Sequence, residues 1–190
     1  KRCLVGSEMC IRDRARTKVE LEPNYSYVTA RILLDELRSE ALSFLGVAEQ
    51  STQQEMFDYY PKALQAFIEK GIELEMLNPE LKTFDLNKLG KAINPDNDFK
   101  FTYLGLQTLY DRYFIHSNDI RYELPQIFFM RVAMGLAIEE EDRENRAIEF
   151  YNLLSSFDYM SSTPTLFNSG TMRPQLSSCY LTTIPDDLDG

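Results

Sequence analysis

The sequence predicts a mainly α-helical fold that ends in a polar loop and one strand. Up to Asp158, apolar residues recur at helical spacing in most segments. After Tyr159 the composition changes to Ser, Thr, Pro, Asn and Gly, which is typical of a loop. A single strand cannot bury a face or satisfy its own edges. We therefore expect the last segment to belong to a larger β-containing domain.

Residues 1–18 are set apart from this prediction. The stretch "CLVGSEMCIRDR", Cys3 to Arg14, back-translates codon by codon into one continuous frame of a transposase-type sequencing adapter. The alternative is a genuine N-terminal arm with a short basic run. We expect residues 1–18 to be adapter-derived or disordered, and exclude them from fold reasoning. Cys179 is then the one cysteine left, so no disulfide can close within the remaining chain, as expected for a reducing, cytoplasmic setting.

The composition bounds the class of protein. A chain of 190 residues, 44% of them apolar, can bury one sizeable core. Its net charge of −10 argues against a partner bound through a nucleic-acid backbone, although a small nucleotide site needs only a few local donors. The longest apolar run, residues 127–138, is too short to cross a membrane and is interrupted by Arg131. No signal-peptide pattern remains once the adapter segment is excluded.

The first half of the chain predicts three helical regions. Residues 27–44 carry an amphipathic pattern of apolar side chains. Residues 56–72 predict one or two short helices, with Pro61 in a first turn. Residues 78–99 are rich in turn signals but include a short helical piece at 86–93.

The second half begins with residues 103–112, which predict a helix or a turn. Pro125 then opens "IFFMRVAMGLAI", which is apolar nearly all round and therefore predicts a buried helix. An acidic run at 139–142 is the expected solvated boundary before a further helix at 144–158. The stretch "SSTPTLFNSGT" predicts a loop, and "LSSCYLTTI", Leu176 to Ile184, is the strand candidate.

Few residues in the chain suggest chemistry. There is no Gly-rich phosphate loop, no metal-ligand spacing of Cys and His, and only one histidine, His116, to which we assign no role. Cys179 remains. A reactive thiol needs partial exposure and polar company, which its neighbours offer. A small core residue is an equally simple interpretation on composition alone.

Three segments, in the same order, resemble the large (α) subunit of class I ribonucleotide reductase. The stretch "STPTLFNSGTMRPQLSSCYL", residues 162–181, closely resembles the start of that family's catalytic region. The stretch "EPNYSYVTARILL", residues 22–34, is similar to the junction where the N-terminal ATP-cone ends. The stretch "ELPQIFFMRVAMGLA", residues 123–137, is similar to the helix that precedes the catalytic barrel.

The resemblance implies a domain organisation and a set of site residues. Residues 19–160 would form the helical N-terminal domain, after a missing ATP-cone, and residues 161–190 would begin the α/β ten-stranded catalytic barrel. No residue is expected to bind a metal. The implied site residues are the redox-active Cys179, the substrate-binding Thr163, Pro164 and Ser178, and the allosteric effector-binding Asp186 and Leu188.

The resemblance also implies an activity and partners. A thiyl radical and a cysteine pair would reduce ribonucleoside diphosphates to deoxyribonucleotides for DNA synthesis and repair. A small (β) subunit would carry the metal-radical cofactor, thioredoxin or glutaredoxin would supply electrons, and ATP or deoxynucleotides would regulate a homodimer. The radical cysteine, the second redox cysteine and the relay tyrosines are expected beyond residue 190, so we expect these 190 residues alone to be inactive. Two alternatives stay open: an adenosylcobalamin-dependent reductase and a non-catalytic helical interaction module.

Overall fold

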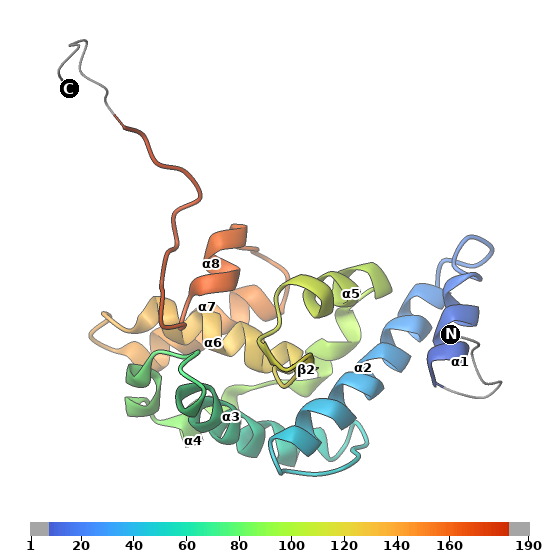
Figure 1. Cartoon of the computed structure of the whole chain (residues 1–190), viewed down its shortest axis with the longest axis horizontal. Helices are drawn as coiled ribbons and strands as arrows, with labels where there is room; N and C mark the ends of the chain where they lie inside the picture. Colours follow the sequence, from blue (N-terminus) through green and yellow to red (C-terminus); the bar gives the residue numbers. More distant parts are fainter. Residues whose placement is uncertain (1–7, 183–190) are drawn as a thin grey trace.

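The computed structural model describes residues 8–182. Helices dominate this part of the chain, and one end of it extends away from the helical body (Figure 1). The α-helices are α1 (Glu8–Arg16), α2 (Tyr25–Phe44), α3 (Met56–Glu73), α4 (Leu86–Ala92), α5 (Tyr103–Arg112), α6 (Pro125–Ala137), α7 (Arg143–Ser155) and α8 (Thr163–Asn168). Two 3₁₀ helices, η1 (Pro79–Thr83) and η2 (Pro95–Lys100), and two short strands, β1 (His116–Ser117) and β2 (Ile120–Arg121), complete the list.

Helix α6 lies at the centre of the core. Every residue from Pro125 to Met134 is buried, as its all-round apolar sequence predicts. It packs along α7 and also contacts α3, η2 and α8. Pro125 occupies the first turn, where its missing N–H leaves no hydrogen bond unmade. The other elements are therefore positioned against α6, either directly or through a neighbour.

The amphipathic helices form where the sequence predicts them. Helix α2 covers the predicted residues 27–44, α4 the predicted 86–93 less its last residue, and α5 the predicted 103–112. Side chains at the N-caps fix two of these starts. Asp85 accepts a hydrogen bond from the Lys88 N–H, and Thr102 accepts one from the Gly105 N–H.

The prediction for Pro61 was wrong. Helix α3 is one helix that begins at Met56, so Pro61 lies inside it and not in its first turn. Proline in a helix interior leaves one carbonyl without its usual donor. The burial of a full face, including Tyr60, Leu64 and Phe67, compensates for that loss.

A hairpin was not predicted. Strands β1 and β2 pair antiparallel, His116 with Arg121 and Ser117 with Ile120. Asn118 and Asp119 form its turn with φ of 49° and 65°. Asn and Asp tolerate this left-handed conformation and favour two-residue hairpin turns, so the Asn-Asp pair was the available signal.

Two predictions for the end of the chain are corrected. Residues 163–168 form the short helix α8 instead of a loop, because Pro164 near its start is already set for helical φ. The predicted strand at 176–184 does not form over residues 176–182, its described part. A strand needs a hydrogen-bonded partner, and these residues leave the helical body without meeting one (Figure 1).

The N-terminal segment is helical where it is described. Helix α1 packs against α2, and Arg12 forms an ion pair with Glu36. Residues 8–16 are helical in this structure, and an adapter-derived or disordered origin for residues 1–18 stays a prediction.

A buried polar network joins α2, α3, η2 and α6. The carboxylate of Asp98 accepts hydrogen bonds from Arg38 at 2.7 Å, from the Tyr60 hydroxyl at 2.7 Å and from Gln126 at 2.8 Å. Tyr151 donates to Gln126 at 2.9 Å and so extends the network to α7. Burial raises the pKa of Asp98, and the positive charge of Arg38 opposes that rise. Because their hydrogen bonds are satisfied in this way, these polar groups hold five elements in fixed register.

Candidate functional site

Helix α8 carries two of the predicted site residues at its N-terminal end. Thr163 is exposed and Pro164 is half-buried. The Thr163 Oγ1 lies 3.2 Å from the Tyr113 hydroxyl at the end of α5. The Tyr113 ring stacks on Phe167 of α8, with centroids 4.5 Å apart. Two contacts with one tyrosine therefore place Thr163 relative to α5.

The other end of α8 is held from the core. Arg131 of α6 donates to the Ser169 carbonyl at 2.6 Å and to the Leu166 carbonyl at 3.2 Å. Its guanidinium also pairs with Glu123 at 2.6 Å, and both side chains are fully buried. Sequence reasoning assigned Arg131 no role. The available signal was a charged residue inside an otherwise apolar run, because a buried charge must be paired.

The segment after α8 is tied to that helix at two points. Asn168 donates from Nδ2 to the Gln175 carbonyl at 2.7 Å, and Thr165 donates from Oγ1 to the Leu176 carbonyl at 3.5 Å. Beyond Leu176 the described residues extend away from the body (Figure 1).

Ser178 and Cys179 lie on this extended segment and are exposed. The Ser178 hydroxyl donates to the Cys179 sulfur at 3.8 Å. Cys179 is therefore not part of the core formed by the described residues. Cys179 follows Leu176 by three residues, so its Cα lies within about 11 Å of the Leu176 Cα.

The structure thus brings the predicted residues together in two groups. Thr163 and Pro164 share α8, and Ser178 and Cys179 share the extended segment that α8 holds at its base. No hydrogen bond joins the two groups within residues 8–182. Asp186 and Leu188 lie outside the described residues.

Two apolar cavities flank α8. One of about 470 Å³ lies between α5 and α8. A second of about 470 Å³ lies between α7 and α8. The apolar wall of the first cavity includes Leu104, Phe157 and Leu166. That of the second includes Leu136, Phe150 and Leu153. The N-terminal end of α8 therefore lies on a face with apolar hollows on both sides.

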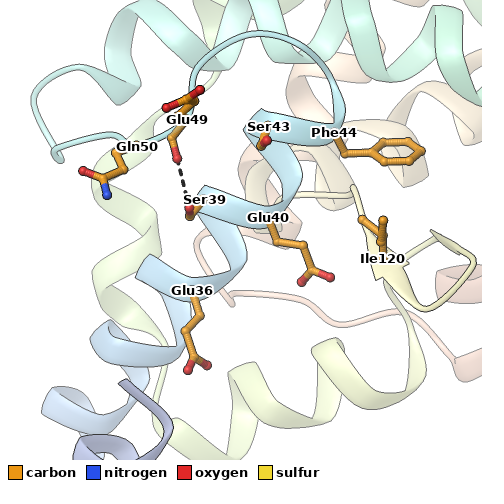
Figure 2. A pocket seen from close by; sticks show the side chains of 8 residues that line it. All are labelled: Glu36, Ser39, Glu40, Ser43, Phe44, Glu49, Gln50 and Ile120. Atoms are coloured by element: carbon orange, nitrogen blue, oxygen red, sulfur yellow. Dashed lines mark hydrogen bonds between the residues drawn. The ribbon is translucent and has the colours of Figure 1, made fainter. Parts of the chain in front are cut away.

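A larger, acidic cavity of about 670 Å³ lies between α2 and the β1–β2 hairpin (Figure 2). Figure 2 shows the carboxylates of Glu36 and Glu40 on the same side of α2, while Ser39 donates to the Glu49 carbonyl at 2.9 Å. Glu40 also accepts from the Arg121 N–H at 3.3 Å. The carboxylates at this cavity disfavour a phosphate-bearing ligand, and none of the predicted site residues lines it.

No group of three or more His, Cys, Asp or Glu side chains within residues 8–182 is placed to hold a metal ion. No helix in that range is long and apolar enough to cross a membrane.

Comparison with known proteins shows which family the chain resembles. Residues 99–174 match the ribonucleotide reductase all-alpha domain, a range that runs from the end of η2 through α8. The chain is 49% identical over 175 residues to a ribonucleoside-diphosphate reductase subunit alpha of Chlamydia muridarum. The chain is therefore similar to ribonucleotide reductase large subunits over most of its own length.

More distant reductase subunits align over the same share of the chain. A ribonucleoside-diphosphate reductase subunit alpha of Helicobacter pylori is 39% identical over 91% of the chain, and the large subunit of Danio rerio is 35% identical over 92%. The chain spans only 16% of the Chlamydia muridarum reductase subunit and 21% of each of the other two.

The all-alpha domain of ribonucleotide reductase covers only part of the candidate site. Its match includes Thr163, Pro164 and the Arg131 contacts with α8, but ends at residue 174. Ser178 and Cys179 lie beyond it, on the segment tied at Leu176.

Proposed function

We propose that the chain serves in the large subunit of a ribonucleoside-diphosphate reductase, which reduces ribonucleoside diphosphates to deoxyribonucleotides for DNA synthesis and repair. The observation that carries this proposal is the placement of Cys179. Its thiol is exposed, accepts from the Ser178 hydroxyl, and follows a segment tied to the helix that bears Thr163. The similarity to ribonucleoside-diphosphate reductase subunits supports the reaction class.

The proposed chemistry is a balanced two-electron reduction. The Cys179 thiol and a second thiol give up two hydrogen equivalents and become a disulfide. The substrate loses its 2′-hydroxyl as water and gains a C–H bond at C2′. An exposed disulfide is readily reduced again by an external dithiol protein, such as thioredoxin or glutaredoxin.

Substrate binding in this proposal uses hydroxyl groups and the backbone. Thr163 and Ser178 are both exposed and offer O–H donors to phosphate or ribose oxygens. Pro164 fixes the backbone between Thr163 and the rest of α8. Such a site needs no basic patch, which agrees with a chain of net charge −10.

The partners belong to the same proposal. A small (β) subunit would supply the radical from its metal-radical cofactor. A second large subunit would form the homodimer, and ATP or deoxynucleotide effectors would bind near Asp186 and Leu188. We place this assembly in the cytoplasm, where thiols stay reduced.

Substitution of Cys179 tests the proposal. In the full-length large subunit containing this chain, Cys179→Ser should abolish multiple-turnover reduction of a ribonucleoside diphosphate with a dithiol reductant, because a hydroxyl cannot form the disulfide. Effector binding should be unchanged. The neighbouring Ser177→Ala is the control and should keep its turnover.

Two outcomes would count against the proposal. Sustained turnover by Cys179→Ser would remove Cys179 from the redox pair. Full wild-type turnover with adenosylcobalamin and without any small subunit would favour the adenosylcobalamin-dependent alternative.

A further inference from the structure

We propose that Arg131 is a positioning residue for the substrate site: from the core, it sets where α8 presents Thr163 and where the Cys179 segment begins. The inference rests on the proposed function of these two residues. Arg131 itself is fully buried and would not touch the substrate.

The geometry of Arg131 is that of a clamp. Its Nε donates to Glu123 Oε1 at 2.6 Å, its Nη1 to the Ser169 carbonyl at 2.6 Å, and its Nη2 to the Leu166 carbonyl at 3.2 Å. A guanidinium has planar donors in fixed directions, so three such bonds define a relative position and not merely a proximity. One side chain of α6 therefore fixes the C-terminal end of α8.

Those carbonyls need the donors that Arg131 offers. The last carbonyls of a helix have no partner within the helix. In a helix of six residues they make up most of the backbone acceptors, and Leu166 and Ser169 are buried. An apolar side chain at position 131 would leave both carbonyls unsatisfied, and α8 would shift to reach water.

The same ion pair also positions the partner of Thr163. Glu123 accepts from the Ile115 N–H at 2.9 Å through its second oxygen. Ile115 follows Tyr113 by two residues, and the Tyr113 hydroxyl is the group beside Thr163 Oγ1. The buried pair of Arg131 and Glu123 therefore positions both partners of the contact between Thr163 and Tyr113.

Further contacts transmit this position along the chain. The Ser169 hydroxyl donates to the Val132 carbonyl at 2.8 Å. Helix α8 in turn holds the Gln175 and Leu176 carbonyls through Asn168 and Thr165. A shift of α8 would thus move Thr163 and the base of the Cys179 segment together.

The test uses the full-length large subunit and four variants. Arg131→Lys keeps the charge beside Glu123 but cannot span both carbonyls. The double variant Arg131→Met with Glu123→Leu removes both charges, so no buried charge is left unpaired and the stability lost in the single variant is restored. The carbonyls of Leu166 and Ser169 still have no donor in this double variant. Arg131→Met alone gives the cost of leaving Glu123 buried without its partner. Arg38→Lys, in the other buried pair and away from α8, is the matched control.

We expect the KM for the ribonucleoside diphosphate to rise about tenfold to a hundredfold in the double variant, and less in Arg131→Lys. Maximal turnover should change less than KM, and Arg38→Lys should keep the wild-type KM. The inference is overturned if the double variant recovers the wild-type KM together with its stability, if Arg131→Lys has the wild-type KM, or if Arg38→Lys raises KM equally.

A second measurement separates this inference from the proposed function. If the wild-type subunit reduces no ribonucleotide, the proposed function fails. Hydrogen exchange still tests the clamp in that case. The amides of Leu166 and Ser169, which bond the carbonyls of Ser162 and Thr165, should exchange faster in Arg131→Lys than in the wild type, and unchanged rates there would sink the clamp.

Discussion

Arg38 and Asp98 form a second buried ion pair, with side chains 6% and 0% exposed. Burial disfavours the charged form of Asp98 and raises its pKa, while the positive charge of Arg38 lowers that pKa. Tyr60 and Gln126 complete the shell of donors around the carboxylate. Each charge is therefore tolerated only because the other is present.

Replacing Arg38 should destabilise the protein in a pH-dependent way. Arg38→Met removes the charge that lowers the pKa of Asp98, so that pKa rises further. A carboxyl group whose pKa is raised in the folded state makes its full contribution to stability at pH values below its pKa in the unfolded state. That contribution is lost as the pH rises through its pKa in the folded state. Denaturation in urea should show a loss of about 3–5 kcal/mol at pH 7 and a smaller loss near pH 4 to 5.

An exposed pair provides the control for Arg38. Lys70 and Glu73 lie 2.9 Å apart on α3 with side chains 35% and 67% exposed. Lys70→Met should cost less than about 1 kcal/mol at either pH. A loss for Arg38→Met that does not depend on pH would contradict the role given to Asp98.

The sequence carries local information on the exposure of Cys179 but none on the contacts of Arg131, for a physical reason. The polar neighbours of Cys179 are its immediate neighbours in the chain, so its exposure could be inferred locally. The partners of Arg131 include carbonyls 35 and 38 residues away. Nothing in the local sequence specifies which distant carbonyls a buried charge will satisfy.

At the scale of elements, the crossing of α6 with the residues after α8 depends on Gly135. A Cβ at position 135 would lie 2.2 Å from the Gly170 nitrogen and 2.7 Å from the Ser169 carbonyl carbon. Gly170 itself has φ of +75°, a conformation that favours glycine. The two glycines let the segments approach at backbone distance.

Gly135→Ala should therefore destabilise the protein although alanine favours helix. Helix propensity alone would stabilise it by about 1 kcal/mol. The clash with backbone atoms forces α6 and residues 169–170 apart, and we expect a net loss of about 1–3 kcal/mol in thermal or chemical unfolding.

Gly105 of α5 is the matched control for Gly135. Its added Cβ would meet only the Thr102 Oγ1 at 3.4 Å and Phe101 at 3.9 Å. Gly105→Ala should be neutral or stabilising by up to about 1 kcal/mol. Equal effects of the two substitutions would show that the close approach at Gly135 has no energetic weight.

Sequence patterns located the long helices because each buries a stripe with a period near 3.6 residues. Helix α8 lacks that pattern. Its six residues offer one buried apolar side chain, Leu166, and its position depends on Arg131. Residues 176–182 have a strand-like sequence but form no strand, because β propensity without a partner strand forms no sheet.

At the scale of the whole molecule, three buried tyrosines make the stability of the fold depend on pH in the alkaline range. Tyr60, Tyr122 and Tyr151 are all fully buried. Burial is the largest cause that raises the pKa of each, and it raises the pKa of Tyr151 to about 12. Their stabilising contribution is complete below pH 10 and is lost as pH rises through the folded pKa values.

Tyr151→Phe should flatten the alkaline stability profile. At pH 8 the variant should be less stable by about 1–3 kcal/mol, because the Asn94 N–H and the Gln126 side chain lose a partner. Between pH 9 and pH 12 it should lose about 2 to 3 kcal/mol less than the wild type. Unfolding free energies across that range check this, and parallel profiles would contradict it.

The bridge between Leu77 and Thr171 joins two segments that lie far apart in the sequence. Helices α6 and α7 close a connection of only five residues, 138–142, whereas the bridge closes a loop of 93 residues, 78–170. The longer loop costs about 2 to 3 kcal/mol more chain entropy. We therefore expect the Leu77–Thr171 bridge, and with it the segment that leads from α8 toward Cys179, to form later in folding than the α6–α7 pair.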